Sequence, residues 1–101
     1  MTLCGGLTDV KSEHCEELAN AVQTHHAEIC EKAGVTADKL NVVHYSTQVV
    51  AGTNYFVKLQ ADDTDVHVHA RIFKGLPHTG GKTQLHSVEA GHSATSELKY
   101  I

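Results

Sequence analysis

Apolar residues in the first third of the chain recur at the spacing of one amphipathic helix. Between residues 12 and 33 they are separated by three, four or seven positions, and His26 occupies a place in the same stripe. The stripe otherwise consists of Cys15, Leu18, Ala19, Val22, Ile29 and Ala33. Ser12 is the expected N-cap and Gly34 the expected C-cap. We therefore predict a single long helix over residues 12–33, which needs a wide partner such as a sheet.

After Gly34 the pattern changes to that of β-strands. Residues 40–48 are rich in β-branched and aromatic side chains, and residues 53–61 and 66–72 alternate between apolar and polar. Residues 83–89 are expected to form a further strand. The pattern predicts an α+β fold, in which one long helix packs across an antiparallel sheet of four to five strands joined by hairpins.

The strand predicted over residues 66–72 alternates most cleanly. We expect His67, His69 and Arg71 to face solvent, and the residues between them to face the core. The acidic run at 62–65 has the composition of a turn, and residues 98–101 are expected to add a short terminal strand or a packed tail.

Size and charge narrow the class of partner. The 101 residues predict one domain over 1–101, with residues 1–8 as a flexible N-terminal arm. Eight Lys and Arg against 12 Asp and Glu give a net charge of −4, which argues against nucleic acid and anionic membranes as partners.

The first residues lack the pattern of a signal peptide, and three cysteines are too few for a disulfide scaffold. A cytoplasmic location is expected, with unconventional export as the alternative.

The connection between the two middle strands has unusual chemistry. It consists of Gln48, Val49, Val50, Ala51 and Gly52, whereas hairpin tips favour polar pairs such as Asn-Gly. An apolar tip exposed to water suggests an interaction surface. The alternative is that the strands continue through both valines into the core.

Two further apolar elements favour the interaction surface. One is the turn at Leu76, Pro77 and His78, and the other is the N-terminal arm with Leu3. In a four-stranded meander, alternate turns emerge at the same end of the sheet, so the turn at 48–52 and this turn share an end. If the arm lies there too, the three elements form a rigid wedge suited to a groove in another protein.

The sequence resembles a known protein family. The run from Gln48 to Tyr55, Gln-Val-Val-Ala-Gly-Thr-Asn-Tyr, is similar to the first binding loop of the cystatin superfamily. The arm over 3–7, the turn at 76–78 and the ending over 97–100 resemble the type 1 cystatins, or stefins. The resemblance covers essentially the whole chain. Residues 35–41 match only loosely, which bears on target preference.

The resemblance implies a reversible, tight-binding inhibitor of papain-like cysteine proteases such as cathepsins, with no catalytic residue and no cofactor. By analogy, Leu3 and Cys4 lie in the non-primed subsites, and Gly5 lets the arm turn away before the catalytic cysteine. Residues 48–52 would lie over the catalytic centre, and residues 76–78 on the primed side.

Nine histidines and three cysteines suggest a metal site or a catalytic site as alternatives. His67 and His69 lie about 7 Å apart along one strand face, but a zinc site usually needs three or four protein ligands. No C-x-x-C or H-E-x-x-H motif is present, and no paired acid and base points to an enzyme. A His-rich metal-binding protein is therefore less favoured, and a cystatin-fold binding module without inhibition is the other alternative.

The same hairpin suggests a change of oligomeric state. If Val49 and Val50 straightened into one long strand, two chains would exchange the arm, helix and first strand. Such a domain-swapped dimer would have no first loop, so the monomer is expected to be the inhibitory form.

Overall fold

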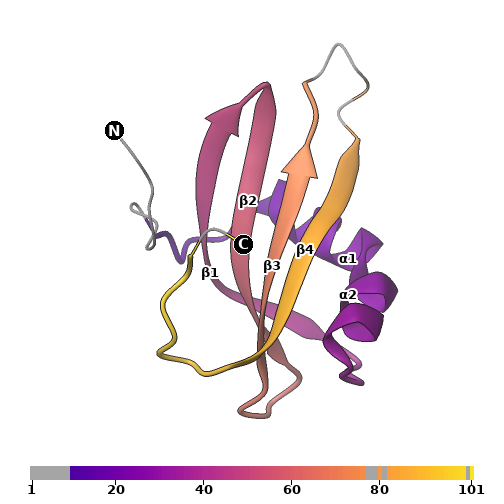
Figure 1. The fold of residues 1–101 in the computed structure, drawn as a ribbon, viewed down its shortest axis with the longest axis vertical. Helices are drawn as coiled ribbons and strands as arrows, with labels where there is room; N and C mark the ends of the chain where they lie inside the picture. Colours follow the sequence, from indigo (N-terminus) through magenta and orange to yellow (C-terminus); the bar gives the residue numbers. More distant parts are fainter. Residues whose placement is uncertain (1–9, 77–79, 81, 100) are drawn as a thin grey trace.

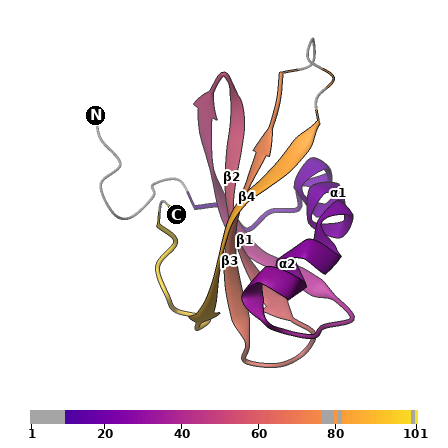
Figure 2. The ribbon, with the colours of Figure 1, turned by 45° about the vertical axis from the view of Figure 1, so that its right-hand side comes forward.

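The computed structural model describes residues 10–76, 80, 82–99 and 101 of the chain. These residues form two helices followed by four strands: α1 (Glu16–Thr24), α2 (His26–Ala33), β1 (Leu40–Val50), β2 (Gly52–Ala61), β3 (His67–Lys74) and β4 (Thr83–His92). The strands make one antiparallel sheet in the order β1-β2-β3-β4, and both helices cover the same face of it (Figure 1 and Figure 2). The predicted α+β fold class is confirmed. Neither helix in this part of the chain is long and apolar enough to cross a membrane.

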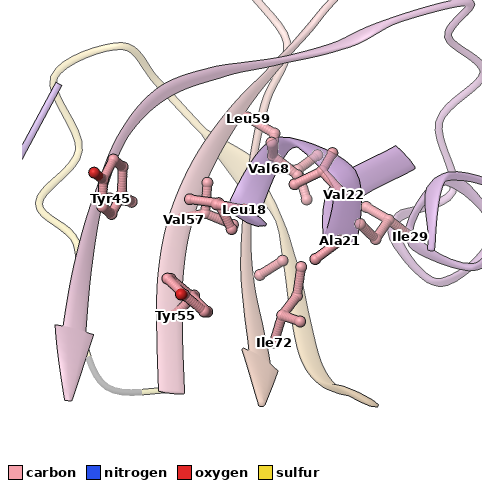
Figure 3. Packing of buried hydrophobic residues seen from close by; sticks show 11 residues of the cluster. Leu18, Ala21, Val22, Ile29, Tyr45, Tyr55, Val57, Leu59, Val68 and Ile72 are labelled. Atoms are coloured by element: carbon pink, nitrogen blue, oxygen red, sulfur yellow. The ribbon is translucent and has the colours of Figure 1, made fainter. Parts of the chain in front are cut away.

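The hydrophobic core lies between the helices and the inner face of the sheet. Leu18 and Val22 of α1 and Ile29 of α2 are buried against it (Figure 3). The sheet contributes alternate residues of its two central strands, and those with no exposed surface are Val57, Leu59, Val68, Ala70 and Ile72. Because side chains alternate along a strand, the residues between these point to the opposite side, here called the outer face.

The prediction of one unbroken helix is wrong, because the helix is interrupted at His25. The backbone of this residue leaves the helical conformation at φ −101° and ψ 13°, which ends α1 and begins α2. Its ring Nε2 lies 2.9 Å from the Thr83 hydroxyl at the start of β4. Its carbonyl still accepts a hydrogen bond from the Ile29 N–H at 2.8 Å. The bend therefore anchors the helical segment on the sheet while Ile29 stays in the core.

The start of α1 also differs from the prediction, since the helix begins after Cys15 and not after Ser12. Lys11 and Tyr45 of β1 exchange two backbone hydrogen bonds of 2.7 and 2.8 Å, which hold this part of the chain extended. Cys15 is itself extended, at φ −127° and ψ 109°. The predicted C-cap is confirmed: Gly34 adopts the left-handed conformation, at φ 71°, that favours glycine.

The chain after β4 folds back across the outer face, opposite the helices (Figure 1 and Figure 2). Lys58 of β2 is fully buried beneath it. The Lys58 Nζ donates hydrogen bonds of 2.7, 3.0 and 2.5 Å to the carbonyl oxygens of Ser93, Ala94 and Ser96. Leu98 packs on Phe56, so the predicted packed tail is confirmed for this residue.

Two histidines predicted to face solvent are buried on the outer face of the sheet. His67 and His69 lie on the outer face but are only 5% and 1% exposed, and Arg71 is half-buried. The His69 ring stacks on His92 with centroids 3.5 Å apart, and neither of its nitrogens has a hydrogen-bond partner among the described residues. Burial, and then the nearby His92, lower the pKa of His69 to about 3. The prediction of exposure is wrong because alternation identifies the face of a strand, not the side chains of other strands that cover it, here the ring of His92 in β4.

Candidate functional site

The β1–β2 connection is a tight hairpin with an apolar, exposed tip. Val50 pairs with Gly52, which leaves Ala51 alone at the turn. Val49 is 82% exposed and Val50 is 48% exposed. The alternative in which both valines enter the core is therefore wrong, and the tip is available to another molecule.

Gly52 is buried, although the residues before it are exposed. Its backbone has φ +130°, and a Cβ built there would lie 2.5 Å from the carbonyl oxygen of Lys74 and 2.6 Å from the ring of Phe73. Only glycine permits so close an approach in this conformation. The hairpin connection over residues 48–52, here called the first loop, therefore packs directly on β3.

Polar side chains join the two strands of the hairpin just below the tip. Gln48 and Asn54 are cross-strand partners, and the Asn54 Nδ2 donates a 3.1 Å hydrogen bond to the Gln48 Oε1. Asn54 is buried, so this bond also satisfies an amide that would otherwise be costly to remove from water. The hydrogen bond between Gln48 and Asn54 consequently holds the two strands together on the outer face, directly below the exposed valines.

The chain that enters the second predicted loop lies at the same end of the sheet. Lys74, the last residue of β3, pairs with Thr53 beside the first loop, and Leu76 follows two residues later with its side chain exposed. Figure 1 shows the β1–β2 hairpin together with the end of β3 and the start of β4, and the β2–β3 turn at the opposite end. Leu76, the described residue of the second predicted turn, therefore lies at the same end of the sheet as residues 48–52.

Five of the predicted contact residues lie outside the described residues: Leu3, Cys4, Gly5, Pro77 and His78. Within the described residues, Lys11 pairs with Tyr45 on the edge of β1 that faces away from β2. The described part of the predicted wedge is therefore residues 48–52 and Leu76.

An ion pair ties the end of β3 to the helical layer. The Lys74 Nζ bonds to the carboxylate of Glu17 in α1, and this hydrogen bond raises the pKa of Lys74. The backbone carbonyl of the same lysine is the group that closely approaches Gly52. Lys74 of β3 thus contacts both helix α1, through its side chain, and the first loop, through its backbone carbonyl.

Two supporting residues, Asn54 and Phe73, were not predicted. Both occupy outer-face positions, where alternation implies exposure, so their own positions gave no signal of a role. A signal did exist at Gly52, because a glycine at the start of a strand often marks the close approach of another backbone.

The described residues contain no group of three or more His, Cys, Asp or Glu placed to hold a metal ion. Cys15 and Cys30 are free, partly buried thiols. What the arrangement provides is a firmly supported apolar edge, which suits binding to another protein.

The close approach at Gly52 leads to a testable prediction. Replacing Gly52 with alanine should lower the free energy of unfolding by about 1–3 kcal/mol, because the new Cβ would overlap a backbone carbonyl that cannot move independently. Gly91→Ala is the matched control, since Gly91 also has a positive φ of 78° but open space around its Cβ position. Urea denaturation of both variants measures the difference. Equal losses in the two variants would show that Gly52 is retained for its backbone angle alone.

Comparison with known proteins connects this architecture to a family. The Cystatin domain model matches residues 5–94. Cystatin-A of Felis catus is 38% identical over 96 residues, which cover 93% of this chain and 94% of that protein. Cystatin-B of Oplegnathus fasciatus is 36% identical over 101 residues, 98% of this chain and 97% of that protein. Leukocyte cysteine proteinase inhibitor 1 of Sus scrofa is 34% identical over 98 residues, 95% of this chain and 91% of that protein. With its helices on a four-stranded meander and matches along nearly its whole length, the chain belongs to the cystatin family, among the stefins.

Proposed function

We propose that this chain is a reversible, tight-binding inhibitor of papain-like cysteine proteases of the cathepsin type. The observation that carries the proposal is the exposed apolar tip at Val49 and Val50, seated on β3 through Gly52. The name of the related porcine protein, a cysteine proteinase inhibitor, supports the same class of target.

Inhibition in this proposal is occlusion of the protease's active-site groove. Residues 48–52 lie over the catalytic centre, residues 76–78 fill the groove on one side, and the arm at 3–5 fills it on the other. The hairpin is ordered before it binds, so little conformational entropy is lost on docking. In this proposal no residue of the chain acts as a nucleophile or transfers a proton. It keeps substrate out and is itself not cleaved.

Titration of a papain-like cysteine protease with the purified chain tests the proposal. Residual activity on a peptide substrate should fall to near zero as the chain approaches equimolar amounts, and the mass of the chain should be unchanged afterwards. A serine protease assayed in parallel should keep its activity, because the wedge is shaped for a different groove. Absence of inhibition at micromolar concentrations would refute the function.

The same titration separates inhibition from simple binding. Co-elution of chain and protease on size exclusion, with full activity retained by the complex, would identify a cystatin-fold binding module. That result would contradict occlusion, even though a complex had formed.

The proposal includes domain swapping as the route to an inactive dimer. Mild heating should convert part of the monomer into a dimer in which Val49 and Val50 lie within one continuous strand. Size exclusion after heating, followed by assay of each peak, should find inhibition only in the monomer. A fully inhibitory dimer would show that the first loop survives dimerisation.

We also propose a cytoplasmic location. Cys15 and Cys30 are free in the structure, as expected where thiols stay reduced. Cell fractionation with a tagged chain should recover it with cytosolic proteins, and recovery mainly from the medium would contradict this.

A further inference from the structure

The aromatic ring of Phe73 contacts the first loop from the strand that leads toward the second. Two of its ring atoms would lie 2.6 and 2.8 Å from a Cβ at Gly52, so the ring lies directly against that glycine. From Phe73 the chain continues through Lys74, the last residue of β3, to the exposed Leu76. The strand that leads to Leu76 therefore also carries the ring that packs on the first loop.

Phe73 also belongs to a row of side chains that supports the loop from the outer face. Its cross-strand partner is Asn54, which in turn bonds to Gln48. On its other side, the ring lies 5.8 Å from the His86 ring at 55°. Each of the four strands contributes one member, so the position of the first loop is supported across the whole width of the sheet.

We infer that Phe73 is a positioning residue for protease inhibition, which holds Gly52 in place and so sets where Val49 and Val50 stand relative to Leu76. The inference rests on the proposed function. Phe73 is not part of the exposed apolar tip, and it acts through the glycine that it covers.

Removing the ring would act on the unbound protein. A gap would open beside Gly52, and glycine has more backbone freedom than any other residue, so the tip would sample several conformations. If only a fraction of molecules held the binding conformation, the apparent affinity would fall by that fraction. The association rate constant would fall, whereas the contacts in the complex, and hence the dissociation rate, would change little. Loss of a direct contact would instead appear mostly in the dissociation rate.

The test uses Phe73→Leu and Phe73→Ala in the full chain. The inhibition constant should rise about 3-fold for leucine and about 10-fold or more for alanine, chiefly through slower association. Hydrogen exchange of the unbound variants should be faster at residues 49–53 than in the wild type. Phe56→Leu is the matched control, because Phe56 lies on the outer face of the neighbouring strand, is buried, and packs on Leu98 away from the loop. It should lower stability and leave the association rate unchanged.

Each outcome bears on the inference. If the wild type inhibits and both Phe73 variants associate as fast as it does, the inference is overturned. It is also overturned if Phe56→Leu slows association equally, since the effect would then be general destabilisation. If the alanine variant does not fold, the leucine variant carries the test. If the wild type itself inhibits no papain-like protease, the proposed function fails, whereas exchange at residues 49–53 still decides whether the ring holds the loop.

Discussion

Replacing Val50 with aspartate is expected to weaken protease inhibition by about 2–4 kcal/mol, or roughly 30- to 1,000-fold in the inhibition constant. Val50 is 48% exposed at the tip of the hairpin, so the substitution should leave the fold intact. In the complex, the new carboxylate would move from water into an apolar contact, where it loses hydration without gaining a partner. Titration of a papain-like protease with each variant gives the inhibition constant directly.

The matched control is Val66→Asp. Val66 is 42% exposed, close to the value for Val50, but it lies beside the β2–β3 turn at the opposite end of the sheet. The identical change there should leave the inhibition constant unaltered, and denaturation should show both variants folded. Equal weakening by the two substitutions, or no weakening by Val50→Asp, would mean that the first loop does not enter the groove.

Acidification from pH 7 to pH 5 should lower the free energy of unfolding by about 2 kcal/mol through His69 alone. The pKa of this histidine is about 3 in the folded chain and near its ordinary 6.5 when unfolded, so within this window the unfolded state binds the extra proton. The free energy of unfolding therefore keeps its full value above pH 6.5, and the contribution linked to His69 is lost as the pH falls toward 3. Burial and the charge on Lys58 lower the pKa of His44 in the same direction, which adds to the slope.

The surroundings of His69 explain why its charged form is disfavoured. It lies opposite Lys58, whose ammonium group is buried, and its ring stacks on His92. The other titratable groups facing it are His44 of β1, His67 of β3 and Glu89 of β4, whose carboxylate bonds to the His92 ring at 2.8 Å. A proton on His69 would place a second cation beside Lys58 with no acceptor for its N–H groups.

Urea denaturation at several pH values between 7 and 5 measures this effect, and few carboxylates titrate in that range. His69→Phe should flatten the pH dependence, because phenylalanine keeps a stacked ring and binds no proton. His86→Gln is the control, since His86 is exposed on the edge strand β4. Its replacement should leave the pH dependence of the free energy of unfolding unchanged. A slope in His69→Phe equal to that of the wild type would show that another group is responsible.

Local periodicity was enough to predict the sheet and its layers. The alternation over residues 53–61 identified the face of β2 that packs against the helices, because a period of two depends only on neighbouring residues. The break at His25 was not predictable in this way. It accompanies a bond to Thr83, 58 positions along the chain, and no local pattern records that contact. The burial of His69 depends equally on a residue distant in the sequence, His92 of β4, whose ring stacks on it.

The exposed tip of the candidate site was also evident from sequence, because valines at a hairpin turn contradict ordinary turn chemistry. Its support was not evident. The contact of Phe73 with Gly52 exists only when β3 pairs with β2 in one register, which the separate strands do not specify by themselves. Sequence therefore indicated what the edge presents to a partner, while the structure explains what holds that edge in position.

Hydrogen exchange of the chain in complex with a papain-like cysteine protease tests most directly whether this edge enters the active-site groove. We predict slower exchange at residues 48–52 and at Leu76 in the complex than in the free chain. The turn at 62–66 and the helix α2 should exchange at the same rate in both. Unchanged exchange at residues 48–52, with slowing at the 62–66 turn or the helices, would contradict the claim that the hairpin end is the inhibitory surface.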